Sequence, residues 1–194
     1  MRLTRPLVLA SASPRRRELL ERFGLTFDVI PAEVNEDVRA GESALALVRR
    51  LSEEKASVVH RRAPQSLVVA GDTAVVLDGE ILGKPETPER GAAMLRKLSG
   101  QTHRVLTGYH LWDGPSGSTV ARTIETAVTF RELPAAWISW YSALAEARGK
   151  AGGYAIQGAG GAMVTRIEGS YPNVVGFPVE CVIWDLLERG WVTL

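Results

Sequence analysis

Short runs of apolar residues alternate along this chain with longer stretches in which apolar residues recur every three or four positions. The short runs, bounded by turn residues, predict strands, and the longer period predicts amphipathic helices. The expected strands are Leu7–Ala10, Phe27–Pro31, Leu67–Ala70, Ala74–Leu77, Glu80–Leu82, Arg104–Trp112, Ser118–Arg131 and Ala162–Ile167. The expected helices are the segment from Pro14 to Phe23, capped by Ser13 and ended by Gly24, and the segments Ser43–Arg62, Thr87–Gly100, Pro134–Leu144 and Pro178–Arg189.

The order of these elements indicates a mixed α/β fold. Strands and helices alternate in the first part of the chain, and long strands typical of antiparallel pairing follow in the second part. Asp78-Gly79 favours a type I′ hairpin turn, and Asp113-Gly114-Pro115 joins the two longest strands. No internal repeat, low-complexity tract or long linker divides the chain.

Composition excludes several classes of protein. The chain has 194 residues, 45% hydrophobic and 23% charged, which suits a globular domain with a sizeable core. A net charge of +1 gives no electrostatic case for nucleic acid or a membrane surface as partner. The single cysteine, Cys181, excludes an internal disulfide and a multi-cysteine metal site. The first apolar stretch is too short for a signal peptide and no run could span a membrane, so we expect a cytoplasmic location.

The segment SASPRRR, residues 11–17, follows a strand and opens a helix. A helix N-terminus presents free N–H groups and attracts anions, and the hydroxyls of Ser11 and Ser13 add donors. Arginine offers a planar fork that matches phosphate, so Arg15 and Arg16 favour a phosphate site. Without a bound polyanion, three arginines would oppose the helix dipole by about a few tenths of a kcal/mol each. A capped helix with solvated arginines is the open alternative, and a Walker loop is absent.

Charged side chains elsewhere could complete such a site. Asp72 follows an apolar strand, where carboxylates commonly face a site at a sheet edge, although an Asx turn explains it equally well. Lys55 recurs on the apolar face of the helix Ser43–Arg62, so its side chain either points inward or only snorkels. Glu36 precedes that helix among acids that we expect to be mostly solvated, and Lys84 stands alone in a turn.

Five glycines between Gly152 and Gly161 are more than a connector needs, and they indicate a backbone that approaches a ligand closely. Gln157 lies among them, and its amide, which donates and accepts side by side, matches the edge of uracil. A flexible loop is the alternative. The residues thus predict a phosphate-binding α/β protein with carboxylates for a divalent metal. Histidine and cysteine are few, so magnesium or manganese fits better than zinc.

A series of motifs follows in chain order: SASPRRRELL, a helix with EKA, then GDT, GKP, LRKLSGQTH, AGGYAIQG and GSYPNVVGFP. The ordered set resembles the Maf family from about Leu7 to Pro178. The resemblance implies a nucleoside triphosphate pyrophosphatase that cuts between the α- and β-phosphates and needs a divalent metal cation, Mg²⁺ or Mn²⁺. It also implies one domain over residues 1–194, with an elongated twisted mixed sheet flanked by helices, and two lobes sharing one deep cleft. That fold is similar to inosine triphosphate pyrophosphatase, and a homodimer is expected.

The resemblance also implies roles for single residues. Asp72 would be the general base that activates water and, together with Glu36, would hold the metal. The residues expected to bind the triphosphate are Ser11, Ser13, Arg16, Lys55 and Lys84. The residues expected to select the base are Arg15, Thr73 and Gln157. Arg17 is left as a solvated surface charge.

Arg15, Thr73 and Gln157 match the branch of the family that acts on dTTP and UTP, and modified pyrimidine nucleotides share the edge that Gln157 would read. The branch that acts on 7-methyl-GTP tends to carry Trp, Gln and Glu at these positions. Leu144–Gly149 and Phe177 depart from the family pattern, away from the proposed chemistry. Two alternatives are another base preference and a septum-formation regulator that only binds nucleotides, although a pure binder would not need Asp72.

Overall fold

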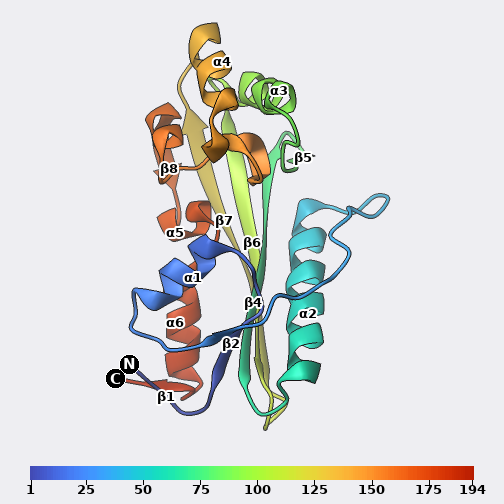
Figure 1. Cartoon of the computed structure of the whole chain (residues 1–194), viewed down its shortest axis with the longest axis vertical. Helices are drawn as coiled ribbons and strands as arrows, with labels where there is room; N and C mark the ends of the chain where they lie inside the picture. The colour runs from blue at the N-terminus through green and yellow to red at the C-terminus, as the bar shows by residue number, and fades with distance from the viewer. The chain divides into compact units, whose positions relative to one another are not determined.

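The computed structural model describes residues 1–194, which form two compact units (Figure 1). Unit 1 comprises Met1–Asp72, Thr107–Ile124 and Gly176–Leu194, and unit 2 comprises Thr73–Leu106 and Glu125–Val175. Three long strands contribute residues to both: β4 (Leu67–Leu77), β6 (Thr102–Asp113) and β7 (Thr119–Phe130). The 7-stranded sheet has the order β3-β2-β4-β6-β7-β8, and β5 pairs with β4.

In unit 1, the short strand β2 (Leu7–Leu9) lies between two parallel neighbours. It pairs with β3 (Asp28–Val29) on one side and with β4 on the other, where Leu7 is opposite Leu67. All three residues of β2 are buried, which explains their uninterrupted apolar sequence. A separate antiparallel pair, β1 (Arg2–Leu3) and β9 (Val192–Thr193), joins the two ends of the chain.

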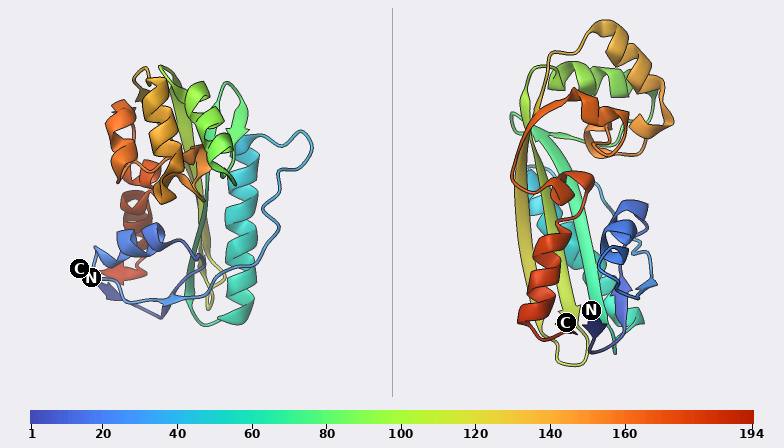
Figure 2. Two further views of the ribbon diagram at one scale, coloured as in Figure 1. Left: turned by 45° about the horizontal axis from the view of Figure 1, so that its top comes forward. Right: turned by 90° about the vertical axis from the view of Figure 1, so that its left-hand side faces the viewer.

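Two helices of unit 1, α2 (Ala44–Arg62) and α6 (Val179–Glu188), cover opposite faces of its strands (Figure 2, teal and red). Gly108 of β6 lies against the backbone of α2, whereas the hydroxyl of the next residue, Tyr109, donates to Asp185 of α6 at 2.5 Å. Successive strand residues point to opposite faces, so these two neighbours place the two helices.

Unit 2 packs α3 (Pro88–Leu98) against α4 (Ala135–Ala143). Its core contains Leu95, Phe130 and Tyr141, which are almost inaccessible to solvent. The shorter elements of the chain are α1 (Pro14–Glu21) in unit 1 and, in unit 2, β5 (Glu80–Leu82), β8 (Val164–Glu168), α5 (Tyr171–Val175) and the 3₁₀ helices η1 (Ala145–Ala147), η2 (Ala151–Gly153) and η3 (Ala159–Met163).

The structure confirms the mixed α/β fold, with a sheet of parallel and antiparallel pairs flanked by helices. Asp78 and Gly79 have φ angles of 49° and 83°, the left-handed conformation that a type I′ turn requires. The side chains of Ser43 and Thr87 accept backbone N–H bonds at the starts of α2 and α3, as N-caps do. Local sequence signals were therefore sufficient to place these ends.

Three local features differ from the expectation. The two strands expected over residues 67–77 are one strand, β4, and Gly71 inside it lets the ring of Phe177 approach, because a Cβ there would lie 3.0 Å from that ring. Ser13 stands at the N-cap of α1 without a capping bond from its side chain, and its N–H instead donates to Ser11 Oγ at 3.2 Å. The glycine-rich stretch contains 3₁₀ turns, which apolar periodicity does not predict.

Two points concern the chain as a whole. None of the helices combines the length and the apolar character needed to cross a membrane. One domain over residues 1–194, with two lobes that share a deep cleft, stays a prediction.

Candidate functional site

Arg16, at the start of α1, is buried, with 8% of its surface exposed, although it was expected to contact phosphate. Its Nη1 donates to the carbonyl oxygen of Gly71 at 2.6 Å and to Ser11 Oγ at 3.2 Å, and its Nε donates to the carbonyl oxygen of Gly176 at 3.0 Å. Burial lowers the pKa of Arg16, and the charge of the nearby Asp72 opposes that shift. The guanidinium therefore ties the SASP turn to the strand that carries Asp72.

The neighbouring arginines have different surroundings. Arg15 is half-buried, and burial lowers the pKa of its guanidinium. Arg17 is exposed and makes an i,i+4 ion pair with Glu21 at 2.7 Å, which confirms that it is a surface charge. The three arginines of SASPRRR thus occupy three environments, and only Arg16 is built into the interior of unit 1.

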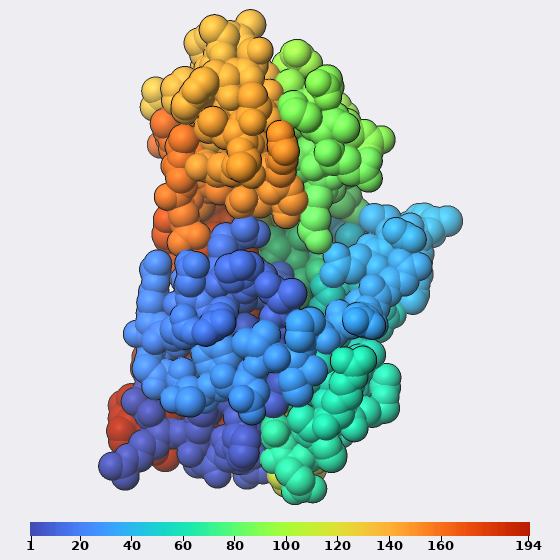
Figure 3. Space-filling model, in the orientation of Figure 1, coloured from blue at the N-terminus to red at the C-terminus, as the bar shows by residue number.

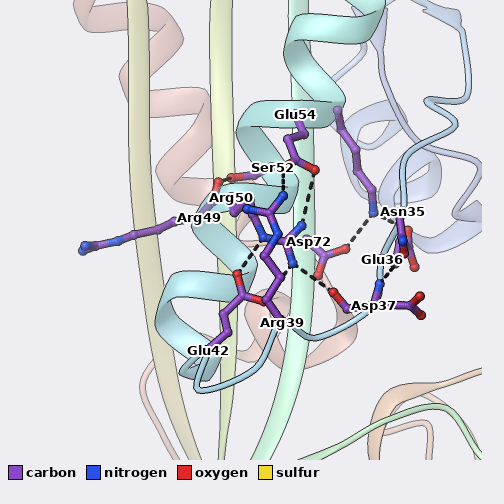
Figure 4. A network of polar contacts seen from close by, with 11 residues as sticks. Asn35, Glu36, Asp37, Arg39, Glu42, Arg49, Arg50, Ser52, Glu54 and Asp72 are labelled. Carbon is purple, nitrogen blue, oxygen red and sulfur yellow. Dashed lines mark hydrogen bonds and ion pairs between the residues drawn. The ribbon is translucent and has the colours of Figure 1, made fainter.

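Lys55, Glu36 and Asp72 form a polar cluster among the predicted residues, and Figure 4 labels its two carboxylates. Lys55 Nζ donates to Glu36 Oε1 at 2.5 Å and to Asp72 Oδ1 at 2.7 Å. The lysine and Asp72 side chains are only 8% and 13% exposed, whereas Glu36 is 45% exposed. Both carboxylates accept from one nitrogen, so their oxygens lie within about 5 Å of each other. Lys55 therefore points inward, one of the two directions that its helix position left open, and its ammonium is paired.

The segment that carries Glu36 is fastened to α2 by Arg50 (Figure 4). Arg50 donates to both oxygens of Glu42 at 2.6 and 2.8 Å, to the carbonyl oxygen of Asp37 at 3.0 Å and to Glu54 at 3.3 Å. The hydrogen bonds from Arg50, together with one from the N–H of Arg39, lower the pKa of Glu42 to about 2. Figure 3 shows this segment, in light blue, at the surface beside α2. Arg50 thus holds this largely exposed chain segment against α2, the helix that carries Lys55.

Unit 2 carries the remaining predicted residues. Thr73 is half-buried in β4, Lys84 is exposed just after β5, and Gln157 is exposed in the glycine-rich segment. Two glycines of that segment do allow a close approach by side chains of the same chain: Gly158 lies against Glu146, and Gly160 lies against Tyr141. A Cβ on Gly158 would lie 2.0 Å from Glu146 Oε2. Internal packing therefore accounts for glycine at this position.

Comparison with known proteins gives an independent assignment. The sequence model of the family described as Maf-like protein matches residues 6–189. The chain belongs to the Maf family. Similar proteins include the "dTTP/UTP pyrophosphatase" of Syntrophus aciditrophicus (strain SB), 44% identical over 98% of this chain and 93% of the relative, and that of Myxococcus xanthus (strain DK1622), 50% identical over 97% and 94%. A third, from Anaeromyxobacter sp. (strain Fw109-5), is 52% identical over 95% and 89% and has the same name.

The solved structure of a HAM1 protein from Coxiella burnetii aligns with a TM-score of 0.43 and 18% identity, over 68% of the Maf chain and 75% of its own. The Maf assignment rests on the sequence comparisons alone.

The carboxylates of the Maf chain decide whether it could hold a divalent cation. No group of three or more His, Cys, Asp or Glu side chains could hold a metal ion. Two carboxylates, those of Glu36 and Asp72, converge on the ammonium of Lys55. Magnesium commonly takes one or two carboxylates and completes its shell with water and substrate phosphates. The donor set therefore fits a cation that is bound together with the substrate.

Sequence reasoning missed two residues that organise the predicted sites, Arg50 and Glu146. Arg50 is a helix residue among several charged neighbours, and its partner Glu42 lies 8 positions earlier, outside the helix. Glu146 lies in the segment that departs from the Maf pattern. The only available signal was the set of glycines that follows it, because glycine marks a close backbone approach without naming the group approached.

Proposed function

We propose that this Maf-family protein is a nucleoside triphosphate pyrophosphatase that hydrolyses dTTP and UTP, and modified pyrimidine nucleotides with the same base edge, to the nucleoside monophosphate and pyrophosphate. The observation that carries the proposal is the set of relatives named dTTP/UTP pyrophosphatase, 44–52% identical over nearly the whole chain. Removing such nucleotides from the pool would be its cellular role. A cytoplasmic location and a homodimer are part of the proposal.

The polar cluster of unit 1 supports a role in the chemical step. Water attacks the α-phosphorus, the bond from that phosphorus to the bridging oxygen breaks, and pyrophosphate leaves with the electron pair. Asp72 takes the proton of the attacking water. Its Oδ1 accepts from Lys55 at 2.7 Å, so we assign Oδ2 as the oxygen that receives the proton. Lys55 fixes the carboxylate in position, because its ammonium is held from the other side by Glu36.

Cations and hydroxyls would bind the triphosphate. In this proposal Arg16, Lys55 and Lys84 neutralise phosphate charge, and Ser11 and Ser13 donate hydrogen bonds. Charge neutralisation and positioning supply most of the catalysis in phosphoryl transfer. Glu36 and Asp72 would hold Mg²⁺ or Mn²⁺, which when bound would polarise the phosphate oxygens.

Three residues would select the base: Arg15, Thr73 and Gln157. The amide of Gln157 can accept from the N–H of uracil or thymine and donate to a neighbouring carbonyl oxygen. Its exposure in the structure is consistent with a side chain that is available to a ligand.

A pyrophosphate-release assay with dTTP, UTP, CTP, GTP and 7-methyl-GTP tests the proposal. We expect dTTP and UTP to be the best substrates and Asp72→Asn to abolish release, because an amide cannot accept the proton of water. Asp78→Asn, the same substitution at an exposed hairpin turn, is the matched control and should leave release unchanged. Nucleotide binding without turnover by the unmodified protein would overturn the enzyme assignment, and undiminished release by Asp72→Asn would remove Asp72 as the base.

A further inference from the structure

Gln157 lies in a stretch of unit 2 whose backbone curves around one carboxylate, that of Glu146. The N–H of Gly160 donates to Glu146 Oε1 at 2.9 Å, and the N–H of Ala159 donates to Oε2 at 3.2 Å. Each oxygen of the carboxylate therefore accepts from a different residue of the stretch. Both donors lie just after Gln157 in the chain.

A second side chain, Tyr141, holds the same stretch on the other side of Gln157. Its hydroxyl donates to Glu146 Oε1 at 2.7 Å and accepts the N–H of Ala155 at 3.0 Å. Tyr141 is completely buried at the end of α4, so its position is set by the core of unit 2. The pair of Tyr141 and Glu146 thus fixes the backbone two residues before Gln157 and two and three residues after it.

Two glycines make this arrangement sterically specific. A Cβ on Gly158 would lie 2.0 Å from Glu146 Oε2, and a Cβ on Gly160 would lie 2.6 Å from the hydroxyl of Tyr141 and 2.5 Å from the carbonyl oxygen of Ala155. Real Cβ atoms do not approach other atoms so closely, and only glycine fits. The packing of Glu146 and Tyr141 therefore requires both glycines. The side chain of Gln157, which lies between these contacts in the chain, is exposed.

The charge of Glu146 suits this role. Burial raises the pKa of its carboxyl, but the hydrogen bonds from Gly160, Tyr141 and Ala159 outweigh burial, and the pKa is lowered overall. An ionised carboxylate is an acceptor at both oxygens, as the two backbone donors require. Lys150 Nζ also donates to the carbonyl oxygen of Glu146 at 2.6 Å, which fixes the residue at its own backbone.

We propose that Glu146 is a positioning residue for base selection: it holds the backbone around Gln157 so that the amide meets the pyrimidine edge. The inference rests on the proposed function. It assigns no contact between Glu146 and the substrate, and Glu146 acts only through Gln157.

The test is Glu146→Gln, compared with the unmodified protein in the same nucleotide assay. Glutamine keeps the size but replaces one acceptor oxygen by an NH₂ group that faces a backbone N–H. We expect KM for UTP to rise by about tenfold or more with a much smaller change in kcat, and the ratio of kcat/KM for UTP over CTP to fall similarly. Glu86→Gln, at an exposed residue paired with Arg90, is the control and should change neither.

A double-mutant cycle separates positioning from general destabilisation. In a Gln157→Ala background, Glu146→Gln should change the UTP over CTP ratio by less than about twofold, because the residue through which it acts is gone. Equal effects in both backgrounds, or an unchanged ratio in Glu146→Gln alone, would overturn the inference. Failure of the unmodified protein to turn over any nucleotide would instead overturn the proposed function.

Tyr141→Phe keeps the test decisive if Glu146→Gln does not fold. Phenylalanine fills the same core space but removes the hydroxyl that joins Glu146 to Ala155. We expect the same loss of UTP over CTP selectivity in a smaller amount, and an unchanged ratio in a folded Tyr141→Phe protein would contradict the inference.

Discussion

Replacing Gly108 by alanine would place a methyl group in the contact between β6 and α2. A Cβ built on Gly108 lies 2.3 Å from the carbonyl oxygen of Val48, 2.6 Å from its carbonyl carbon and 3.1 Å from the nitrogen of Arg49. Unstrained carbon–oxygen contacts begin at about 3.3 Å, so the helix and strand must separate by about 1 Å. The neighbour is helix backbone rather than a flexible side chain, so the strain cannot be relieved by a rotamer change.

The magnitude follows from two opposing effects. Overpacking of this kind costs about 1–3 kcal/mol. Gly108 does not have a positive φ, so alanine also removes conformational freedom from the unfolded chain, which returns up to about 1 kcal/mol. We therefore expect the free energy of unfolding to fall by about 1–2 kcal/mol. Lys55 lies on α2 about 10 Å beyond Val48, and a helix shift of about 1 Å would displace it from both carboxylates and lower kcat/KM by up to about 100-fold.

Urea denaturation and steady-state kinetics with UTP measure the two effects separately. Gly91→Ala is the matched control, because a Cβ there would meet Pro85 and Ser142 at an ordinary 3.8 Å inside α3. The free energy of unfolding of that variant should rise by up to about 1 kcal/mol, and its activity should be unchanged. Unchanged stability and unchanged kcat/KM in Gly108→Ala would refute the argument that this contact sets the position of Lys55.

Further measurements address the metal, the base, a buried carboxylate and a buried histidine. Activity should require added Mg²⁺ or Mn²⁺, and full activity in excess chelator would contradict the metal proposal. Gln157→Glu should weaken the use of UTP much more than it lowers stability, which a nucleotide panel and a melting curve compare. Asp185→Asn should lower the free energy of unfolding, measured by urea denaturation, by about 2 kcal/mol, because Tyr109 and Arg122 both donate to this carboxylate. An unchanged free energy of unfolding would contradict the stabilising role of these hydrogen bonds. Burial lowers the pKa of His103 to about 4. The unfolded chain then binds a proton that the folded protein does not, so stability should fall as pH drops from about 6.5 to about 4. That pH dependence should weaken in His103→Phe.

Features set by neighbours in the sequence could be predicted, and features set by the tertiary fold could not. The starts of the helices at Ser43 and Thr87 and the turn at Asp78 depend on residues within three or four positions, and the structure confirms them. Helical periodicity placed Lys55 on the apolar face of its helix but left open whether its side chain points inward or snorkels. Periodicity could not predict the partners of Lys55. Asp72 reaches the lysine only because β4 pairs within the sheet, and Glu36 reaches it only because Arg50 bonds the neighbouring Asp37.

The glycine-rich stretch shows how one local signal can have more than one explanation. Glycines at 158 and 160 did indicate a close approach, and sequence alone could not distinguish a ligand from a side chain of the same protein. The approaching groups are the carboxylate of Glu146 at Gly158, and the hydroxyl of Tyr141 and the carbonyl oxygen of Ala155 at Gly160. Gly158 and Gly160 allow side chains of the same protein to pack against the chain around Gln157.

Arg16, at the start of α1, is a second residue whose internal contacts the sequence did not reveal. Its charge opposes the helix dipole, but its donors are used by two backbone carbonyls, those of Gly71 and Gly176, and by Ser11 Oγ. A lysine could not serve such divergent acceptors, because its three donors share one nitrogen. Gly71 directly precedes Asp72. Arg16 therefore fixes the backbone just before Asp72, whereas Lys55 fixes the carboxylate of Asp72 itself. Both cations therefore constrain the position of Asp72, and the effects on kcat of substituting Arg16 and Lys55 should be non-additive.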